Sequence, residues 1–296
     1  MKGRVKFLLA LTIFSLAVTT GVGRSGNLKK YLALYGTYLD YGNSKLKKDG
    51  YAVTLYGSLG DGVHQGIEAA VSRLHLNYKS GYEDLDQTDY TLAYIRTGDP
   101  FPHLSLRLGG HYISSDDELT DEGRILFGDL LYFIPYRWNL GLEVAYSEYH
   151  HRTDFEVLQL RPHAGYFLRL GSRVLYLEGS GYYIHPHRWS KLGLPLRNYY
   201  ALELSATHTR GPWKLRLSGW VGQQVFAVRR AGFVVYNLRE KYKGGVSGEI
   251  TYHQGAYFLG LTATWNTYVE FKFLPHRQSD GVHRLGGVSL LSPCEG

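Results

Sequence analysis

The chain has 296 residues, a formal net charge of +7 and one cysteine, Cys294. A single cysteine excludes an internal disulfide framework, and the basic residues form no block of the kind that binds nucleic acid. The hydrophobic fraction of 44% and the mean hydropathy of −0.24 are low for a protein that crosses a membrane with helices.

The first 23 residues have the order of a secretory signal peptide. Lys2, Arg4 and Lys6 form a basic start, residues 7–18 are apolar, and 21–23 offer small residues for cleavage. Without the three basic residues the formal charge falls from +7 to +4. The alternative is an uncleaved anchor, but the apolar run is shorter than the roughly 20 residues that a membrane-spanning helix needs. We therefore expect a signal peptide at 1–23 and one domain at 24–296.

Beyond residue 30 the chain is a succession of segments in which apolar and polar residues alternate, the pattern of β-strands with one buried face. No later stretch is long and apolar enough for a membrane-spanning helix. Twelve strands are an alternative count, and our preferred count is fourteen. The predicted strands are 30–41, 51–60, 63–78, 87–97, 103–113, 123–134, 138–149, 156–170, 173–184, 198–209, 212–228, 233–253, 256–268 and 282–291.

The clearest unit is a hairpin at 159–184 with Gly171-Ser172 as a two-residue turn. This turn places Leu168 opposite Leu175 on an apolar face, and His163 opposite Ser180 on a polar face. We expect similar hairpins with turns at 135–137, 210–211 and 254–255. Their apolar faces include Leu142, Leu204, Leu217 and Leu259. In each hairpin the turn and the alternation agree independently.

The predicted connections alternate between short and long, as in outer-membrane barrels with short periplasmic turns and longer outer loops. Tyrosine and tryptophan on the apolar face lie near both ends of the strands, where aromatic girdles are expected. The fold class predicted is all-β: a transmembrane antiparallel up-and-down β-barrel located in the bacterial outer membrane. The loops divide by charge, and we expect the basic residues Arg229 and Arg230 at the outer mouth.

Charged residues on the polar face near mid-height are the candidate pore residues. Asp129 and Glu143 fall directly opposite each other across the turn at 135–137, so a cation, a proton or a nearby arginine is expected between them. Structural wall charges and a selective constriction are the two interpretations. The candidates are Glu68, Arg107, Asp129, Glu143, Arg161, His163, Glu178, Glu203, Arg216 and Glu249.

No catalytic motif, metal site or cofactor is predicted. His163, Ser180 and Glu178 share the polar face, but chance explains them in a chain with 13 histidines. Two histidine pairs, His150-His151 and His185-Pro186-His187, lie in loops and are a weak signal for a metal. A lipid-modifying barrel enzyme is therefore the less favoured alternative.

In length, strand count and alternating connections the chain resembles the small monomeric porins with fourteen strands. The resemblance implies passive diffusion of small hydrophilic solutes or ions through a monomer. The partners it implies are membrane lipids, lipopolysaccharide, the outer-membrane assembly machinery and small solutes, with no nucleic acid. A second hypothesis is a plugged structural or surface barrel without conductance, in which the loop 269–281 (Phe271, Phe273, Leu274) folds inward.

Overall fold

The computed structural model describes residues 6–18, 28–42, 44–150, 154–171, 173–236, 240–255 and 257–270. Within these ranges no helix is long and apolar enough to cross a membrane. The elements are β1 (Lys6–Val18), β2 (Lys29–Asp40), β3 (Lys47–Gly60), β4 (Gln65–Tyr78), β5 (Leu85–Thr97), β6 (Leu104–Ser115), β7 (Arg124–Ile134), β8 (Trp138–Tyr149), β9 (Phe155–Leu170), β10 (Arg173–Pro186), β11 (Tyr199–Arg210), β12 (Trp213–Gln224), β13 (Val228–Arg229), β14 (Val234–Val235), β15 (Glu240–Gln254) and β16 (Tyr257–Glu270).

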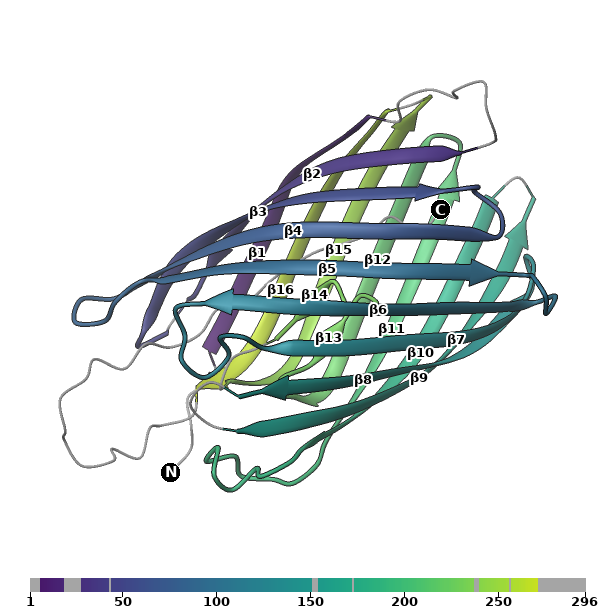
Figure 1. Cartoon of the computed structure of the whole chain (residues 1–296). Helices are drawn as coiled ribbons and strands as arrows, with labels where there is room; N and C mark the ends of the chain where they lie inside the picture. The colour runs from purple at the N-terminus through teal and green to yellow at the C-terminus, as the bar shows by residue number, and fades with distance from the viewer. Residues whose placement is uncertain are drawn as a thin grey trace.

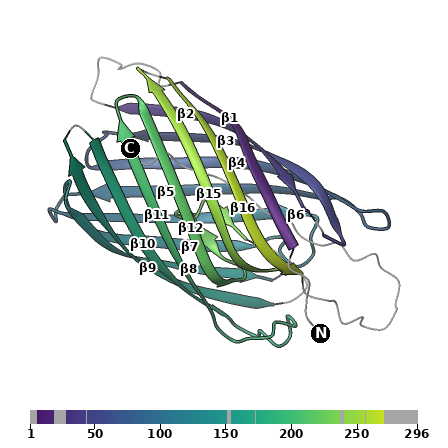
Figure 2. The ribbon, with the colours of Figure 1, turned by 180° about the vertical axis from the view of Figure 1, so that it is seen from behind.

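Fourteen of these strands close into one barrel, and β13 with β14 forms a separate two-stranded sheet. Figure 1 shows β2 to β9 across the near side, and Figure 2 shows β10, β11, β12, β15, β16 and β1 across the other side. Every neighbouring pair in the barrel is antiparallel, and the pairing of β1 with β16 joins the two ends of the strand order and closes the ring. The predicted all-β barrel is confirmed, and thirteen of the fourteen predicted strands are present in the ring, with β1 as the fourteenth.

The ring is closed differently from the sequence-based expectation. Residues 6–18, inside the predicted signal peptide, form β1 and pair with both β16 and β2. The predicted last strand at 282–291 and most of the predicted plug loop, with Phe271, Phe273 and Leu274, lie outside the described residues. Removal of residues 1–23 therefore stays a prediction. Such removal takes away β1, the strand that closes the barrel between β16 and β2.

Two-residue turns with glycine first set the register of three hairpins. Gly171, Gly211 and Gly255 all have positive φ, a conformation that glycine adopts without a steric cost. The predicted register around Gly171 is confirmed, since Leu168 pairs with Leu175. The predicted turns at 210–211 and 254–255 are one residue too early. Arg210 pairs with Trp213, and Gln254 pairs with Tyr257. Pairs therefore shift by two residues, which leaves every side chain on its predicted face.

The outer face of the barrel is an apolar belt. Leu204 is 71% exposed, Leu217 56% and Leu142 45%. Trp138 and Trp213 are exposed at the short-turn ends of their strands, as predicted for one aromatic girdle. A closed ring exposes no strand edge, so it can cross lipid with its backbone hydrogen bonds satisfied. The chain has the architecture of an outer-membrane β-barrel, a class in which the short turns lie at the periplasmic end.

Inward-facing residues near the long-loop end form an apolar core rather than an open mouth. Leu39, Leu74, Ile113, Tyr149 and Ile184 are at most 1% exposed, and each lies near the long-loop end of its strand. Phe155 stacks on Tyr149 with ring centroids 4.6 Å apart, and Phe226 packs 5.0 Å from Phe155. The outer part of the lumen is filled with side chains, as in the interior of a soluble domain.

The segment 225–236, which we call the inward segment, lies inside the barrel and carries β13 and β14 (Figure 1). The predicted strands 212–228 and 233–253 were therefore too long, since β12 ends at Gln224 and β15 begins at Glu240. A register shift between Val221 and Gln224, with Gly222 at φ 133°, interrupts β12. The runs 225–228 and 233–236 are apolar on successive residues, so burial stabilises them more than an extended hairpin in water.

Candidate functional site

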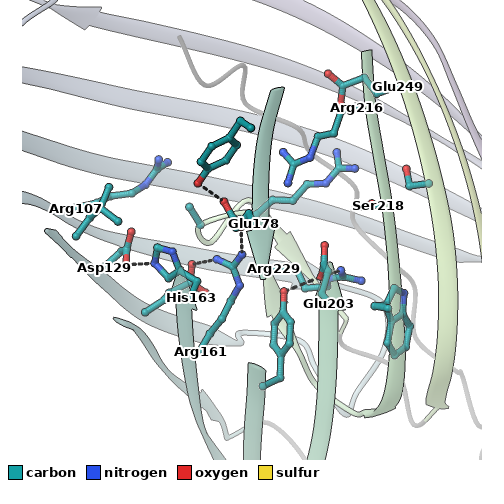
Figure 3. Close-up of a pocket in the computed structure, with 18 of the residues that line it drawn as sticks. Arg107, Asp129, Arg161, His163, Glu178, Glu203, Arg216, Ser218, Arg229 and Glu249 are labelled. Atoms are coloured by element: carbon teal, nitrogen blue, oxygen red, sulfur yellow. Dashed lines mark hydrogen bonds and ion pairs between the residues drawn. The ribbon is translucent and has the colours of Figure 1, made fainter. Parts of the chain in front are cut away.

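A cavity of about 480 Å³ lies in the lumen beneath the inward segment (Figure 3). Its wall comes from strands β4 to β12, β15 and β16, and its roof includes Arg229, Arg230, Ala231 and Tyr236. All ten predicted pore residues line this one cavity: Glu68, Arg107, Asp129, Glu143, Arg161, His163, Glu178, Glu203, Arg216 and Glu249. Alternation alone placed them on one face, and barrel closure brings them together.

Four charged residues form a row across adjacent strands. Arg107 on β6 pairs in register with Asp129 on β7, which pairs with Glu143 on β8, which pairs with Arg161 on β9. The row therefore reads positive, negative, negative, positive. The predicted juxtaposition of Asp129 and Glu143 is present in the register. Two adjacent carboxylates repel each other, so each needs its own partner.

A separate side chain contacts each of the two carboxylates. His163 Nε2 lies 3.0 Å from Asp129 Oδ1, and Arg161 Nη1 lies 3.5 Å from Glu143 Oε2. Arg161 also donates through Nη2 to Glu178 Oε1 at 3.0 Å, so it bridges two carboxylates. A nearby arginine was expected at this pair, and Arg161 has this role, whereas the Arg107 guanidinium binds the Glu68 carboxylate. The result is a wall in which charges are largely matched.

A second cluster joins the wall to the inward segment. The Arg229 guanidinium on β13 binds the Glu203 carboxylate on β11, and Tyr182 donates its hydroxyl to Glu203 Oε2 at 3.0 Å. Three aromatic rings surround Arg229, at 5.4 Å for Trp220, 5.6 Å for Tyr236 and 5.7 Å for Tyr182. Such cation–π contacts are strongest where water is excluded. Arg229 was predicted at the outer mouth, and the structure places it inside the lumen instead.

Two arginines of the cavity differ from the rest. Arg216 on β12 pairs in register with Glu249 on β15, and Arg230 on the inward segment interacts electrostatically with both. Within the described part of the chain neither Arg216 nor Arg230 makes a hydrogen bond or an ion pair shorter than 4.0 Å. Figure 3 shows the Arg216 side chain pointing into the cavity beside Glu249. Among the described residues this sector therefore has two guanidinium groups without a direct ion pair, beside one carboxylate.

Main-chain and ring contacts hold the inward segment in place. Gln159 on β9 donates through Nε2 to the Val228 carbonyl at 2.6 Å and accepts from the Val228 amide at 3.0 Å. Phe233 packs edge-on to Tyr56 at 5.6 Å and lies 5.2 Å from the Arg107 guanidinium. The segment is therefore attached to opposite sides of the barrel, through β9 and β11 on one side and β3 and β6 on the other.

In the described part of the chain, the side chains of His163 and Ser180 contact other residues. His163 is turned to Asp129, and Ser180 accepts a hydrogen bond from Arg161 at 3.3 Å. His150 in the loop after β8 lies 2.6 Å from Asp154, and this contact raises the histidine pKa, since the carboxylate stabilises the protonated ring. Among the described residues no group of three or more metal-ligating side chains is present.

The residues that sequence reasoning missed come mainly from the inward segment. Arg230 and Tyr236 belong to a stretch that was taken for extended strands and their turn, and Trp220 was not singled out. A signal did exist, because 225–228 and 233–236 lack the alternation that all neighbouring strands show. A consecutive apolar run beside glycine breaks indicates a buried segment rather than a lipid-facing hairpin.

Comparisons with known proteins give structural neighbours only. No protein-family model matches the chain, and no curated protein is similar to it in sequence. The outer membrane protein OpdK of Pseudomonas aeruginosa is 11% identical, with 90% of this chain and 98% of that one covered and a TM-score of 0.34. OccAB1 of Acinetobacter baumannii is 8% identical, with 90% and 96% covered and a TM-score of 0.33.

A bacterial polysaccharide outer membrane secretin is 9% identical, with 91% of this chain and 99% of that one covered and a TM-score of 0.38. The structural neighbours are thus outer-membrane proteins. The assignment of the fold rests on the strand order, the register and the exposed belt of this chain.

Proposed function

We propose that this barrel is an outer-membrane channel for small hydrophilic solutes or ions, with the inward segment as its seal. The observation that carries the proposal is the charged cavity inside the barrel, with five arginines and six carboxylates on its lining. A purely structural interior gains more stability from apolar packing than from buried ion pairs. Charged walls instead keep a lumen hydrated and select among solutes.

The inward segment and the apolar core above it close the outer side of the cavity. Passage of a solute therefore requires the inward segment to move. This movement breaks the attachments of the segment to the wall and leaves the barrel folded. They consist of the Gln159 hydrogen bonds, the Arg229–Glu203 ion pair and the ring contacts of Phe233. Local opening of a segment needs less free energy than unfolding of the whole barrel.

A planar lipid bilayer measures the proposed activity directly. Purified protein should give discrete conductance steps in wild-type form. A variant that lacks residues 226–235, joined by a short glycine-serine linker, should give larger and more frequent steps because the seal is missing. Unaltered spectroscopic strand content and heat-modifiable electrophoretic mobility would show that the variant still folds. Absence of conductance in both proteins would overturn the channel proposal.

A second candidate function is a barrel with a permanently closed lumen that acts as a surface or structural protein. The specific observation in its favour is the burial of the inward segment, where Val225, Phe226 and Phe233 have no exposed surface. This candidate predicts no conductance in the wild type and conductance only after deletion of the segment. The same bilayer experiment therefore separates the two functions.

A further inference from the structure

We propose that Arg216 and Arg230 form a binding site for a small oxyanion, a phosphate or a carboxylate, and that the bound anion holds the inward segment closed. This inference rests on the proposed channel function for its physiological meaning, while the site itself stands on the geometry of the cavity. The two arginines come from different parts of the molecule, the barrel wall and the inward segment.

Arg216 and Arg230 differ from the other cavity arginines in their local charge balance. The other three arginines of the cavity each have a carboxylate partner: Glu68 for Arg107, Glu143 and Glu178 for Arg161, and Glu203 for Arg229. Arg230 interacts electrostatically with Glu249, which lies in register with Arg216, and Arg216 also interacts electrostatically with Glu203. Glu249 Oε1 accepts a hydrogen bond from Thr251 at 3.2 Å. The sector around them therefore has two arginines beside Glu249, whereas the rest of the lining has three arginines and five carboxylates.

The guanidinium groups of Arg216 and Arg230 are chemically complementary to an oxyanion. A guanidinium presents several N–H donors in a plane, a geometry that matches two oxygens of a phosphate or carboxylate. Both side chains line the same cavity, which at about 480 Å³ accommodates a small organic acid or inorganic phosphate. Partial desolvation in the lumen strengthens a charge-assisted hydrogen bond relative to bulk water. Small neutral solutes lack the charge to use this sector.

An oxyanion bound between Arg216 and Arg230 stabilises the closed position of the inward segment. Arg216 and Arg230 are like charges, so their repulsion opposes the closed position of the segment. An oxyanion between them replaces this repulsion with attraction to both the wall and the segment. By linkage, a ligand that binds the closed form more tightly than the open form shifts the equilibrium towards the closed form. The anion acts from within the cavity, beneath the seal.

Isothermal titration calorimetry on the full-length protein in detergent tests the site without a need for conductance. Inorganic phosphate and acetate, at low ionic strength, should each give saturable binding to the wild type. Arg216→Gln and Arg230→Gln should each weaken this binding at least about tenfold, since each removes a charge-assisted hydrogen-bonding group. Arg210→Gln, at the short turn and outside the cavity, is the matched control and should bind as the wild type does.

Equal affinity in Arg216→Gln, Arg230→Gln and the Arg210→Gln control would overturn the site, as would the absence of saturable binding to the wild type. Arg230→Lys keeps the charge and should retain part of the affinity. If both glutamine variants fail to fold, weaker binding in a folded Arg216→Lys and Arg230→Lys double variant supports the site, and unchanged binding overturns it.

Thiol labelling tests the link to the segment. In a Cys294→Ser background, Ala231→Cys at the tip of the segment should react more slowly with a water-soluble maleimide when phosphate is present. The protection should vanish when Arg216→Gln is added. Binding by calorimetry with unchanged labelling would overturn the link to the seal. Binding and protection in a protein that never conducts would instead reject the channel function while the oxyanion site stands.

Discussion

The side-chain amide of Gln159 binds both main-chain groups of Val228, as a neighbouring β-strand would. It donates to the Val228 carbonyl and accepts from the Val228 amide. Replacement of Gln159 by leucine keeps the volume but leaves the Val228 amide and carbonyl without this partner. An unsatisfied buried group costs about 1–3 kcal/mol. We therefore expect Gln159→Leu to loosen the inward segment and to increase conductance in planar bilayers.

The control for this variant is Thr54→Val, which removes a buried hydrogen bond of 2.8 Å to Ser72 on the barrel wall. It should lower stability slightly and leave conductance unchanged. If Gln159→Leu conducts no better than this control, the Gln159 side chain does not hold the seal.

The assignment of faces predicts opposite outcomes for neighbouring positions on β12. Leu217 is 56% exposed on the lipid face, whereas Ser218 lines the cavity. An arginine at Leu217 should cost roughly 2–4 kcal/mol near the bilayer midplane. An arginine at Ser218 meets a lining that includes six carboxylates and should cost much less. Unfolding in urea from lipid vesicles measures both, and a reversed order would show that the faces are wrong.

The sequence was sufficient for the faces and for most strand positions between residues 29 and 224, because period-two alternation continues along β2 to β12. Turn positions were harder. At Gly171 the glycine was taken as the first turn residue, which is correct, whereas at Gly211 and Gly255 it was taken as the second. Positive φ at the first position of a tight hairpin turn, a role that glycine fills best, would have resolved all three in the same way.

The inward segment could not be derived from alternation, because its stability depends on partners that are remote in sequence. Arg229 reads as a basic loop residue until Glu203 and three aromatic rings surround it. The pairing of Arg161 with both Glu143 and Glu178 depends likewise on side-chain directions within the closed ring. Composition and periodicity carry no information about such contacts.

The ion pair between Arg161 and Glu143 should show strong energetic coupling. The two side chains are 15% and 2% exposed. Arg161→Gln leaves Glu143 buried without its cation, which costs about 3–5 kcal/mol, and Glu143→Gln in the same protein should recover part of this loss. A double-mutant cycle by urea unfolding in vesicles measures the coupling.

The outward pair Arg73–Asp86, with side chains 58% and 40% exposed, is the matched control. Disruption of that pair should cost no more than about 1 kcal/mol. Additive effects of Arg161→Gln and Glu143→Gln would contradict the interaction that the structure shows.

The short turn between β3 and β4 predicts an acid-dependent contribution to stability. Asp61 Oδ1 accepts hydrogen bonds from the amides of Val63, His64 and Gln65 at 2.7–3.0 Å. These bonds favour the ionised carboxylate and lower the pKa of Asp61 to about 2. Because the folded pKa lies below the ordinary value of about 3.9, the contribution is present above that value and lost as the pH falls towards 2.

In Asp61→Asn the side chain accepts similar hydrogen bonds without titrating. The difference in unfolding midpoint between wild type and Asp61→Asn should therefore change between pH 4 and pH 2 and stay constant above pH 5. A constant difference over the whole range would show that these bonds do not stabilise the charged form.

Removal of the predicted signal peptide leaves a gap in the barrel ring at the position of β1. β2 and β16 are both antiparallel to β1, so they run in the same direction and leave a position for one strand antiparallel to both. If residues 1–23 are removed on export, another strand must fill this position. The segment 282–291 was predicted as a strand and follows β16 in the chain, so after the connection at 271–281 it has the required direction.

Mass spectrometry of the protein from outer membranes should therefore give a first residue near Arg24. A chain truncated after residue 281 should fail to assemble when the signal peptide is cleaved, because the ring then has thirteen strands and two unpaired edges. A truncated chain with a substitution that blocks cleavage is the informative control. If the first 23 residues are retained in the native protein, and the truncated chain assembles with them, β1 is a permanent strand of the barrel.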